Sequence, residues 1–87
     1  MKKVFKYPAA QQIELPAGAE IIHAGMDGQL MPCVWAIVDP DIQERETVKL
    51  HCIWTGVEIP PQATRYLGTY ISPGGLVWHV FAEEVQP

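Results

Sequence analysis

Proline and glycine interrupt this chain so often that a long regular helix is not expected. Eight prolines and seven glycines are spread over its 87 residues, and no apolar pattern of helical period persists between them for three turns. Short runs rich in β-branched and aromatic residues, bounded by such breakers, are typical of sandwiches and small barrels. The sequence therefore predicts an all-β fold, a small antiparallel β-sandwich or partly open barrel of about six to seven strands.

Two hairpins account for most of the predicted strands. Asp27-Gly28 follows an expected strand and favours a two-residue type I′ turn, because both central positions of that turn need positive φ. The returning strand is expected to begin at Gln29, so that the first hairpin covers residues 20–39. A second hairpin is expected over residues 66–81, with its turn between Ser72 and Gly75.

The three tryptophans fall in the most apolar runs of the chain. Residues 33–38 are apolar on both alternating faces, which is typical of a central strand. Residues 47–54 alternate between apolar and polar side chains and predict a half-buried antiparallel strand. Large aromatic side chains in such runs usually fill the core. We therefore expect Trp35, Trp54 and Trp78 to be core residues.

Length and composition indicate one folded domain spanning residues 1–87. A hydrophobic fraction of 48% with 18% charged residues is unlike that of disordered chains, and a chain this short has little room for a second core. The net charge is −4, and half of the six basic residues are Lys2, Lys3 and Lys6. Without a basic stripe, direct binding to nucleic acid is not expected.

The amino-terminal residues and the two cysteines bear on the compartment. Lys2 and Lys3 are followed by Lys6 and Pro8 before any long apolar run, so no signal peptide is recognisable. No apolar segment reaches the length of a membrane-spanning helix. Reduced thiols at Cys33 and Cys52 would suit a cytoplasmic protein.

The sequence contains no pattern that predicts an enzyme. Ser72 is the only serine and precedes Pro73 in an expected turn, whereas nucleophilic catalysis needs a nucleophile beside a base. His51 and Cys52 are adjacent on an expected strand, so their side chains point to opposite faces and do not easily share a metal ion. We expect no catalytic residues, no metal and no cofactor.

Two surfaces are candidates for contact with a partner protein. The first is a charged loop expected over residues 41–46, whose acidic surface also includes Asp39. The second is a pair of tyrosines that we expect on one strand face, with Gly68 between them; tyrosine is enriched at protein interfaces. The candidate partner-binding residues are Asp39, Asp41, Glu44, Glu46, Tyr66 and Tyr70.

Several short segments along most of the chain resemble small proteins encoded by bacteriophages and prophages, whose function is unassigned. The resemblance implies a phage setting and a bacterial cytoplasm, and it implies no catalytic mechanism. The segments that carry it are Phe5-Lys6-Tyr7-Pro8, residues 13–19, Trp35-Ala36-Ile37-Val38-Asp39-Pro40, Thr55-Gly56, Ile59-Pro60, Tyr66-Leu67-Gly68-Thr69 and residues 76–81.

A small acidic protein without catalytic residues is most economically a binding protein. The leading hypothesis is a phage protein that binds a host protein and inhibits a bacterial defence system, as an anti-CRISPR protein does; the host protein could be a nucleic-acid-binding effector. A second hypothesis is a virion or assembly accessory that forms a homo-oligomer through a free strand edge or through the face with Tyr66 and Tyr70. A third is a sponge for a small signalling ligand, which the scarcity of Arg and Lys disfavours.

Overall fold

The computed structural model describes residues 1–83, and within this range no residue is helical. The seven strands are β1 (Lys3–Pro8), β2 (Gln12–Pro16), β3 (Glu20–Met26), β4 (Pro32–Val38), β5 (Arg45–Trp54), β6 (Ala63–Ile71) and β7 (Val77–Glu83).

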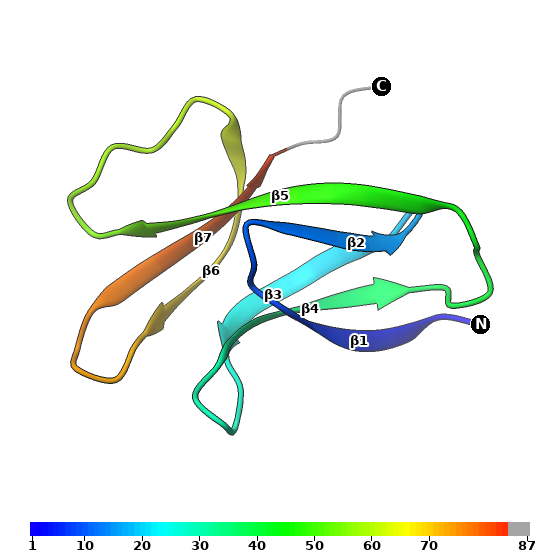
Figure 1. Ribbon diagram of the computed structural model, residues 1–87, viewed down its shortest axis with the longest axis horizontal. Helices are drawn as coiled ribbons and strands as arrows, with labels where there is room; N and C mark the ends of the chain where they lie inside the picture. Colours follow the sequence, from blue (N-terminus) through cyan, green and yellow to red (C-terminus); the bar gives the residue numbers. More distant parts are fainter. Residues whose placement is uncertain (84–87) are drawn as a thin grey trace.

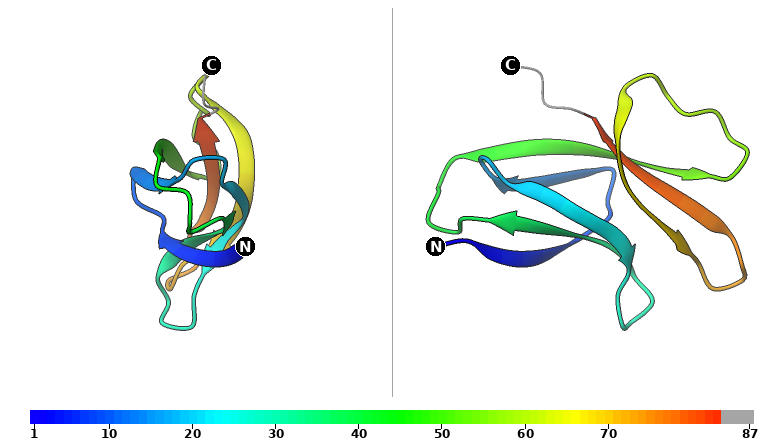
Figure 2. Two further views of the ribbon diagram at one scale, coloured as in Figure 1. Left: turned by 90° about the vertical axis from the view of Figure 1, so that its right-hand side faces the viewer. Right: turned by 180° about the vertical axis from the view of Figure 1, so that it is seen from behind.

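The strands form two antiparallel sheets. One sheet has the order β1-β4-β3 and the other the order β2-β5-β7-β6. Figure 1 shows the two sheets facing each other, and the edge-on view in Figure 2 shows that they do not close into a barrel. The all-β prediction is therefore confirmed, with seven strands arranged as an open sandwich.

The core lies between the facing sheets and is built from small and medium-sized aliphatic side chains. Strand alternation puts every second residue on the inner face, so β4 contributes three side chains and β5 two. The buried core residues are Ile13, Leu15, Ile21, Ala24, Val34, Ala36, Val38, Val48, Leu50, Leu67, Val80 and Ala82.

The tryptophans do not belong to this core, contrary to the prediction. Trp35 lies on the outer face of β4, opposite His23 of β3, and the two rings are 5.7 Å apart. Trp54 is 49% exposed, and Trp78 is half-buried. For Trp54 and Trp78 the core prediction was wrong because β5 and β7 extend beyond the other sheet, which would have covered their ends (Figures 1 and 2). For Trp35 it was wrong because strand alternation puts its side chain on the outer face.

The first predicted hairpin exists, but its turn is longer than Asp27-Gly28 indicated. Strands β3 and β4 pair up to Met26 and Pro32, and the residues between them form a loop closed by a hydrogen bond from the Asp27 N–H to the Met31 carbonyl. Leu30 has the positive φ of 62°, and Gly28 does not. Pro32 explains the difference, since it lacks an N–H and starts the strand three residues later than predicted.

The second predicted hairpin is also present and is longer than expected. Strand β6 begins at Ala63, three residues before the expected start, and β7 continues to Glu83, two residues beyond the expected end. The pairing of β6 with β7 is interrupted by two bulges, one of them between Tyr66 and Gly68.

Strands β3 and β6 pack closely where the two sheets meet. The Arg65 guanidinium of β6 donates a hydrogen bond of 2.9 Å to the Ile21 carbonyl of β3. A Cβ atom at Gly68 would lie only 2.4 Å from the Ala24 carbonyl oxygen, so this position requires glycine. Beyond this crossing the ends of β5, β6 and β7 continue as a single layer (Figure 1).

Candidate protein-binding groove

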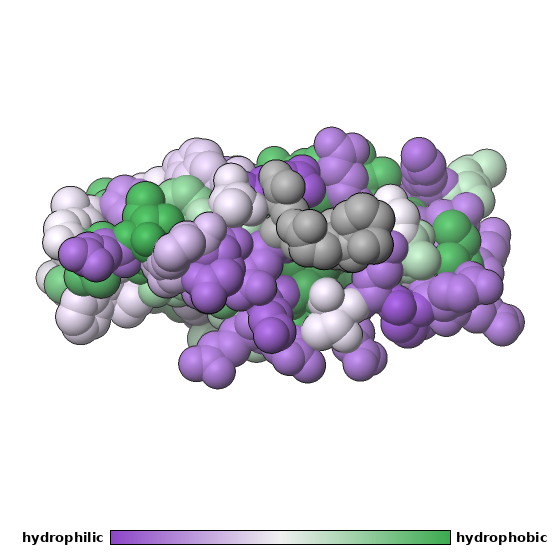
Figure 3. Space-filling model, turned by 90° about the horizontal axis from the view of Figure 1, so that it is seen from above, coloured by the Kyte–Doolittle hydropathy of each residue, from purple (hydrophilic) through white to green (hydrophobic). Residues whose placement is uncertain are grey.

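Exposed apolar side chains gather at the end of the molecule where the four-stranded sheet is uncovered. Figure 3 shows hydrophobic and near-neutral residues around the 55–62 loop and mainly hydrophilic residues over the middle of the molecule. Exposed apolar side chains that lie near one another are candidates for a binding surface. The residues concerned are Trp54, Val57, Ile59, Tyr66, Ile71 and Leu76.

Two tryptophans pack against each other at the centre of this region. Trp54 of β5 and Trp78 of β7 are directly opposite in the strand register, and their ring centroids are 5.1 Å apart with the planes tilted by 59°. Because β5 and β7 pair at this point, both rings project from the inner face of the sheet. Within residues 1–83 no strand of the other sheet covers them, so the paired rings form an accessible apolar platform.

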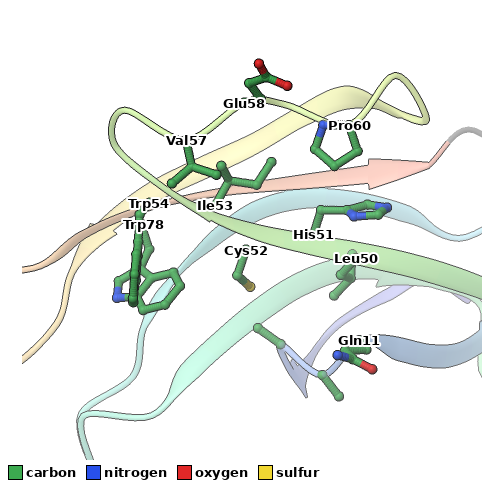
Figure 4. A pocket seen from close by; sticks show the side chains of 12 residues that line it. Gln11, Leu50, His51, Cys52, Ile53, Trp54, Val57, Glu58, Pro60 and Trp78 are labelled. Carbon is green, nitrogen blue, oxygen red and sulfur yellow. The ribbon is translucent and has the colours of Figure 1, made fainter.

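A groove with a volume of about 540 Å³ runs along β5 beside these rings. Residues 9–11 form one wall, and the loop after β5 forms the other through Val57, Glu58 and Pro60. Figure 4 shows Trp54 and Trp78 side by side, with the loop above β5 and Gln11 below it. Except for Glu58, His51 and Gln11, the side chains that line the groove are apolar or weakly polar.

The floor of the groove is an unpaired strand edge. Strand β2 pairs with β5 only as far as Lys49, and the last bond on this edge runs from the Leu50 N–H to the Gln11 carbonyl at 2.9 Å. In an antiparallel strand the N–H and carbonyl groups of successive residues point alternately to its two edges. The backbone groups of Cys52 and Trp54 therefore point to the same edge as the Leu50 N–H. Among the described residues no strand pairs with Cys52 or Trp54 on this side, and no loop group bonds to the N–H or carbonyl of Cys52 or to the N–H of Trp54.

The wall formed by the 55–62 loop is held by a turn and by side-chain hydrogen bonds. Gly56 has a φ of 92°, which glycine adopts without strain, and the Val57 N–H donates to the Trp54 carbonyl at 3.2 Å. His79 links Thr55, 2.7 Å from its Nε2, to Thr69, 3.0 Å from its Nδ1. Tyr66 extends this network, since its hydroxyl lies 2.6 Å from Thr69 Oγ1.

This network was not predictable from the sequence. Its one signal was His79, a titratable residue in an otherwise apolar strand. Because Thr55 and Thr69 come from different segments, their convergence on His79 depends on the pairing of β6 with β7 and on the turn after β5. The network fixes the loop that forms the groove wall.

The thiol and the phenol beneath the tryptophans are neutral near pH 7. Burial raises the pKa of the Cys52 thiol above its ordinary value. Burial, together with contact with Cys52, raises the pKa of Tyr70 to about 12. A protonated, partly buried thiol is a poor nucleophile, so Cys52 contributes to the groove as an apolar contact.

The acidic residues predicted as a contact surface lie at the opposite end of β5 from the groove. The loop covers only residues 39–44, because β5 begins at Arg45, and Glu46 is therefore a strand residue. The Asp41 N–H donates to the Asp39 carboxylate at 3.1 Å, and the Met1 amino group is 3.6 Å from each of these two carboxylates. Asp41 and Glu44 are exposed, whereas Asp39 and Glu46 are half-buried.

The two candidate tyrosines do not share a strand face, contrary to the prediction. The bulge between Tyr66 and Gly68 adds a residue, so Tyr66 lies opposite Phe81 and Tyr70 opposite Trp78. Tyr66 is exposed on the outer face with its ring 5.5 Å from that of Phe81. Tyr70 packs against the core on the inner face, so of the two tyrosines it is the one on the face of the tryptophans.

The described residues show neither a metal centre nor a membrane-spanning helix. Over residues 1–83, no group of three or more His, Cys, Asp and Glu side chains is placed to hold a metal ion. Over the same range, no helix has the length and apolarity needed to cross a membrane. Cys33 and Cys52 are free thiols.

The fold and the groove define a small two-sheet β protein with an accessible aromatic platform beside a free strand edge. The chain belongs to the family described as a domain of unknown function, DUF7352, whose model matches residues 1–87. No curated protein and no solved structure matches the chain significantly.

Proposed function

We propose that this protein is a binding module that recognises another protein through the groove along β5. The observation that carries the proposal is the Trp54–Trp78 platform, half-exposed and adjacent to unpaired backbone groups of β5. Aromatic residues are enriched in interfaces and dominate their energetics. An unpaired strand edge adds hydrogen-bond donors and acceptors that an extended segment of a partner can use.

A narrower form of the proposal concerns the identity of the partner. The sequence resemblance supports a phage or prophage origin and a bacterial cytoplasm. Inhibition of a host defence protein is the role that best fits a small acidic protein of such an origin whose sequence carries no recognisable catalytic motif. The net charge of −4 and the exposed Asp41 and Glu44 also support a partner with a basic surface. Defence effectors that bind nucleic acid have such surfaces.

Storage of a small phosphorylated ligand is less well supported. Neither lysine nor arginine lines the groove among the described residues, and phosphate recognition depends on these side chains. The remaining charged wall residue, Glu58, would repel an anion. A protein partner therefore fits the groove better than a nucleotide does.

A pull-down from bacterial lysate tests the proposal. The tagged wild-type protein should retain one stoichiometric partner, and Trp54→Ala should lose it. Met31→Ala is the matched control, because Met31 is an apolar side chain of similar exposure, 57%, in the loop between β3 and β4. Equal recovery of the partner by the wild type and by Trp54→Ala would contradict the assignment of the groove.

The narrower form is tested by infection. Expression of the wild-type protein in a host with an active defence system should raise the plating efficiency of a sensitive phage, and expression of Trp54→Ala should not. The same phage plated on a host without that system is the control. A wild-type protein that leaves plating unchanged in defended hosts would exclude defence inhibition while leaving the pull-down result intact.

A further inference from the structure

Strand β1 offers a second unpaired edge, on the other sheet, and none of its residues lines the groove. It pairs on one side with β4 along its full length, and among residues 1–83 no strand pairs with its other side. Figure 1 shows β1 at the lower border of the molecule. Its apolar residues are also accessible, since Val4 is 55% and Phe5 40% exposed.

The register of β1 with β4 determines which backbone groups point outward. The Ala9 N–H donates to the Pro32 carbonyl at 3.0 Å. Counting back along the antiparallel register, residues 3, 5 and 7 use their backbone groups to pair with β4. The N–H and carbonyl groups of Val4 and Lys6 therefore point to the open side and provide two donors and two acceptors.

The lysine in the middle of this edge does not obstruct pairing. Edge-strand lysines commonly prevent sheets from joining, but the Lys6 ammonium lies 2.9 Å from the Asp27 carboxylate, whose side chain is only 8% exposed. This ion pair neutralises Lys6 and holds its side chain on the outer face of the sheet. The edge is left with exposed apolar side chains and accessible backbone groups.

Two copies of β1 can pair antiparallel about a two-fold axis that passes through residue 4, 5 or 6. Of these three registers, only the one centred on Phe5 does not place two lysines directly opposite each other. A register centred on residue 4 sets Lys2 against Lys6 of the partner subunit, and one centred on residue 6 sets Lys6 against the partner's Lys6. A register centred on Phe5 sets Val4 against the partner subunit's Lys6 and Phe5 against the partner's Phe5. Directly opposed like charges destabilise a sheet, whereas aromatic pairs stabilise it.

We propose that two copies of the chain form a symmetric dimer by antiparallel pairing of their β1 strands, centred on Phe5. Val4 of each copy exchanges two backbone hydrogen bonds with Lys6 of the partner subunit, which makes four in the dimer. The two β1-β4-β3 sheets then form one continuous six-stranded sheet. Two-fold dimers with self-complementary interfaces are the commonest homo-oligomers, and this interface uses none of the residues that line the β5 groove.

Sedimentation velocity over a concentration series tests the dimer. The wild-type mass should rise with concentration from 9.7 kDa to twice that value. Val4→Pro removes an outward N–H that β4 does not use, and it should weaken dimerisation about tenfold or more, since each dimer loses two hydrogen bonds. Val4→Thr retains the N–H and should dimerise like the wild type. Circular dichroism melts establish that each variant is folded.

A cysteine cross-link tests the register independently. In a Cys52→Ser background, Phe5→Cys places two thiols at a pair whose Cα atoms are about 4.5 Å apart, within the range of a disulfide. Mild oxidation should link this variant into dimers, whereas Lys3→Cys, whose neighbour is Tyr7 of the partner subunit, should remain unlinked. A wild-type protein that stays monomeric at all concentrations, or equal cross-linking of both cysteine variants, would overturn the proposal.

Discussion

The Asp27 carboxylate shows how one side chain can set the shape of a loop that sequence patterns describe incorrectly. It accepts hydrogen bonds from the backbone N–H groups of Gln29 and Met31 at 2.9 and 3.0 Å. It also forms the ion pair with Lys6. Asp27-Gly28 indicated a two-residue turn, but these contacts, together with Pro32, favour a longer loop. The hairpin was predictable from local residues; its loop was not, because Lys6 comes from a distant strand.

Asp27→Asn should remove a pH-dependent part of the stability. The backbone N–H of Met31 and the Lys6 ammonium hold the pKa of Asp27 well below its usual range. A lowered folded-state pKa stabilises the protein above the unfolded value, near 4, and this stabilisation is lost as the pH falls toward the folded value. The stability difference between wild type and Asp27→Asn should therefore be largest at pH 7 and shrink below pH 4.

Urea denaturation between pH 3 and pH 7 measures that difference. Asp41→Asn is the matched control. Asp41 is an exposed aspartate of the 39–44 loop, and among the described residues no backbone N–H donates a hydrogen bond to its carboxylate. A difference between wild type and Asp27→Asn that stays constant over this pH range would show that the carboxylate charge does not stabilise the loop.

At the scale of strands, the sequence predicted pairing better than it predicted faces. The alternation of β5 was correct, with Leu50, Cys52 and Trp54 on one face. The shared face of Tyr66 and Tyr70 was wrong, because a single bulge residue reverses the orientation of everything after it. Gly68 is the local mark of the bulge, since glycine in a strand often signals one, but its close approach to Ala24 of the other sheet depends on how the sheets pack. The groove was missed for a related reason, since it depends on where β2 stops pairing with β5.

Gly68→Ala should destabilise the protein by about 1–3 kcal/mol, the usual cost of forcing an extra methyl group into a packed contact. Its Cβ would lie 2.4 Å from the Ala24 carbonyl oxygen, a backbone atom that can move only if β3 and β6 separate. Gly28→Ala is the control, because no atom lies within 4 Å of the Cβ position and its φ is not positive. Equal stabilities of the two variants in urea denaturation would contradict the close packing of β3 on β6.

At the scale of the whole molecule, β5 connects two surfaces of different character. Its ten residues span about 33 Å at 3.3 Å per residue, with the acidic 39–44 loop at one end and the tryptophan platform at the other. That separation is several times the screening length of about 8 Å at physiological ionic strength. The loop charges can therefore attract a basic partner during encounter without contributing to contacts in the groove.

The two surfaces should consequently affect different rate constants for the partner identified by pull-down. Trp54→Ala should raise the dissociation rate roughly thirtyfold or more, the effect of losing a central aromatic contact. The double substitution of Asp41→Asn with Glu44→Gln should lower the association rate a few-fold at low salt and leave dissociation unchanged, as charges at an interface rim do. Surface plasmon resonance at two salt concentrations measures both constants. If the loop variant instead accelerated dissociation as much as Trp54→Ala, the 39–44 loop would itself be part of the bound interface, and the groove would be only one end of a longer contact along β5.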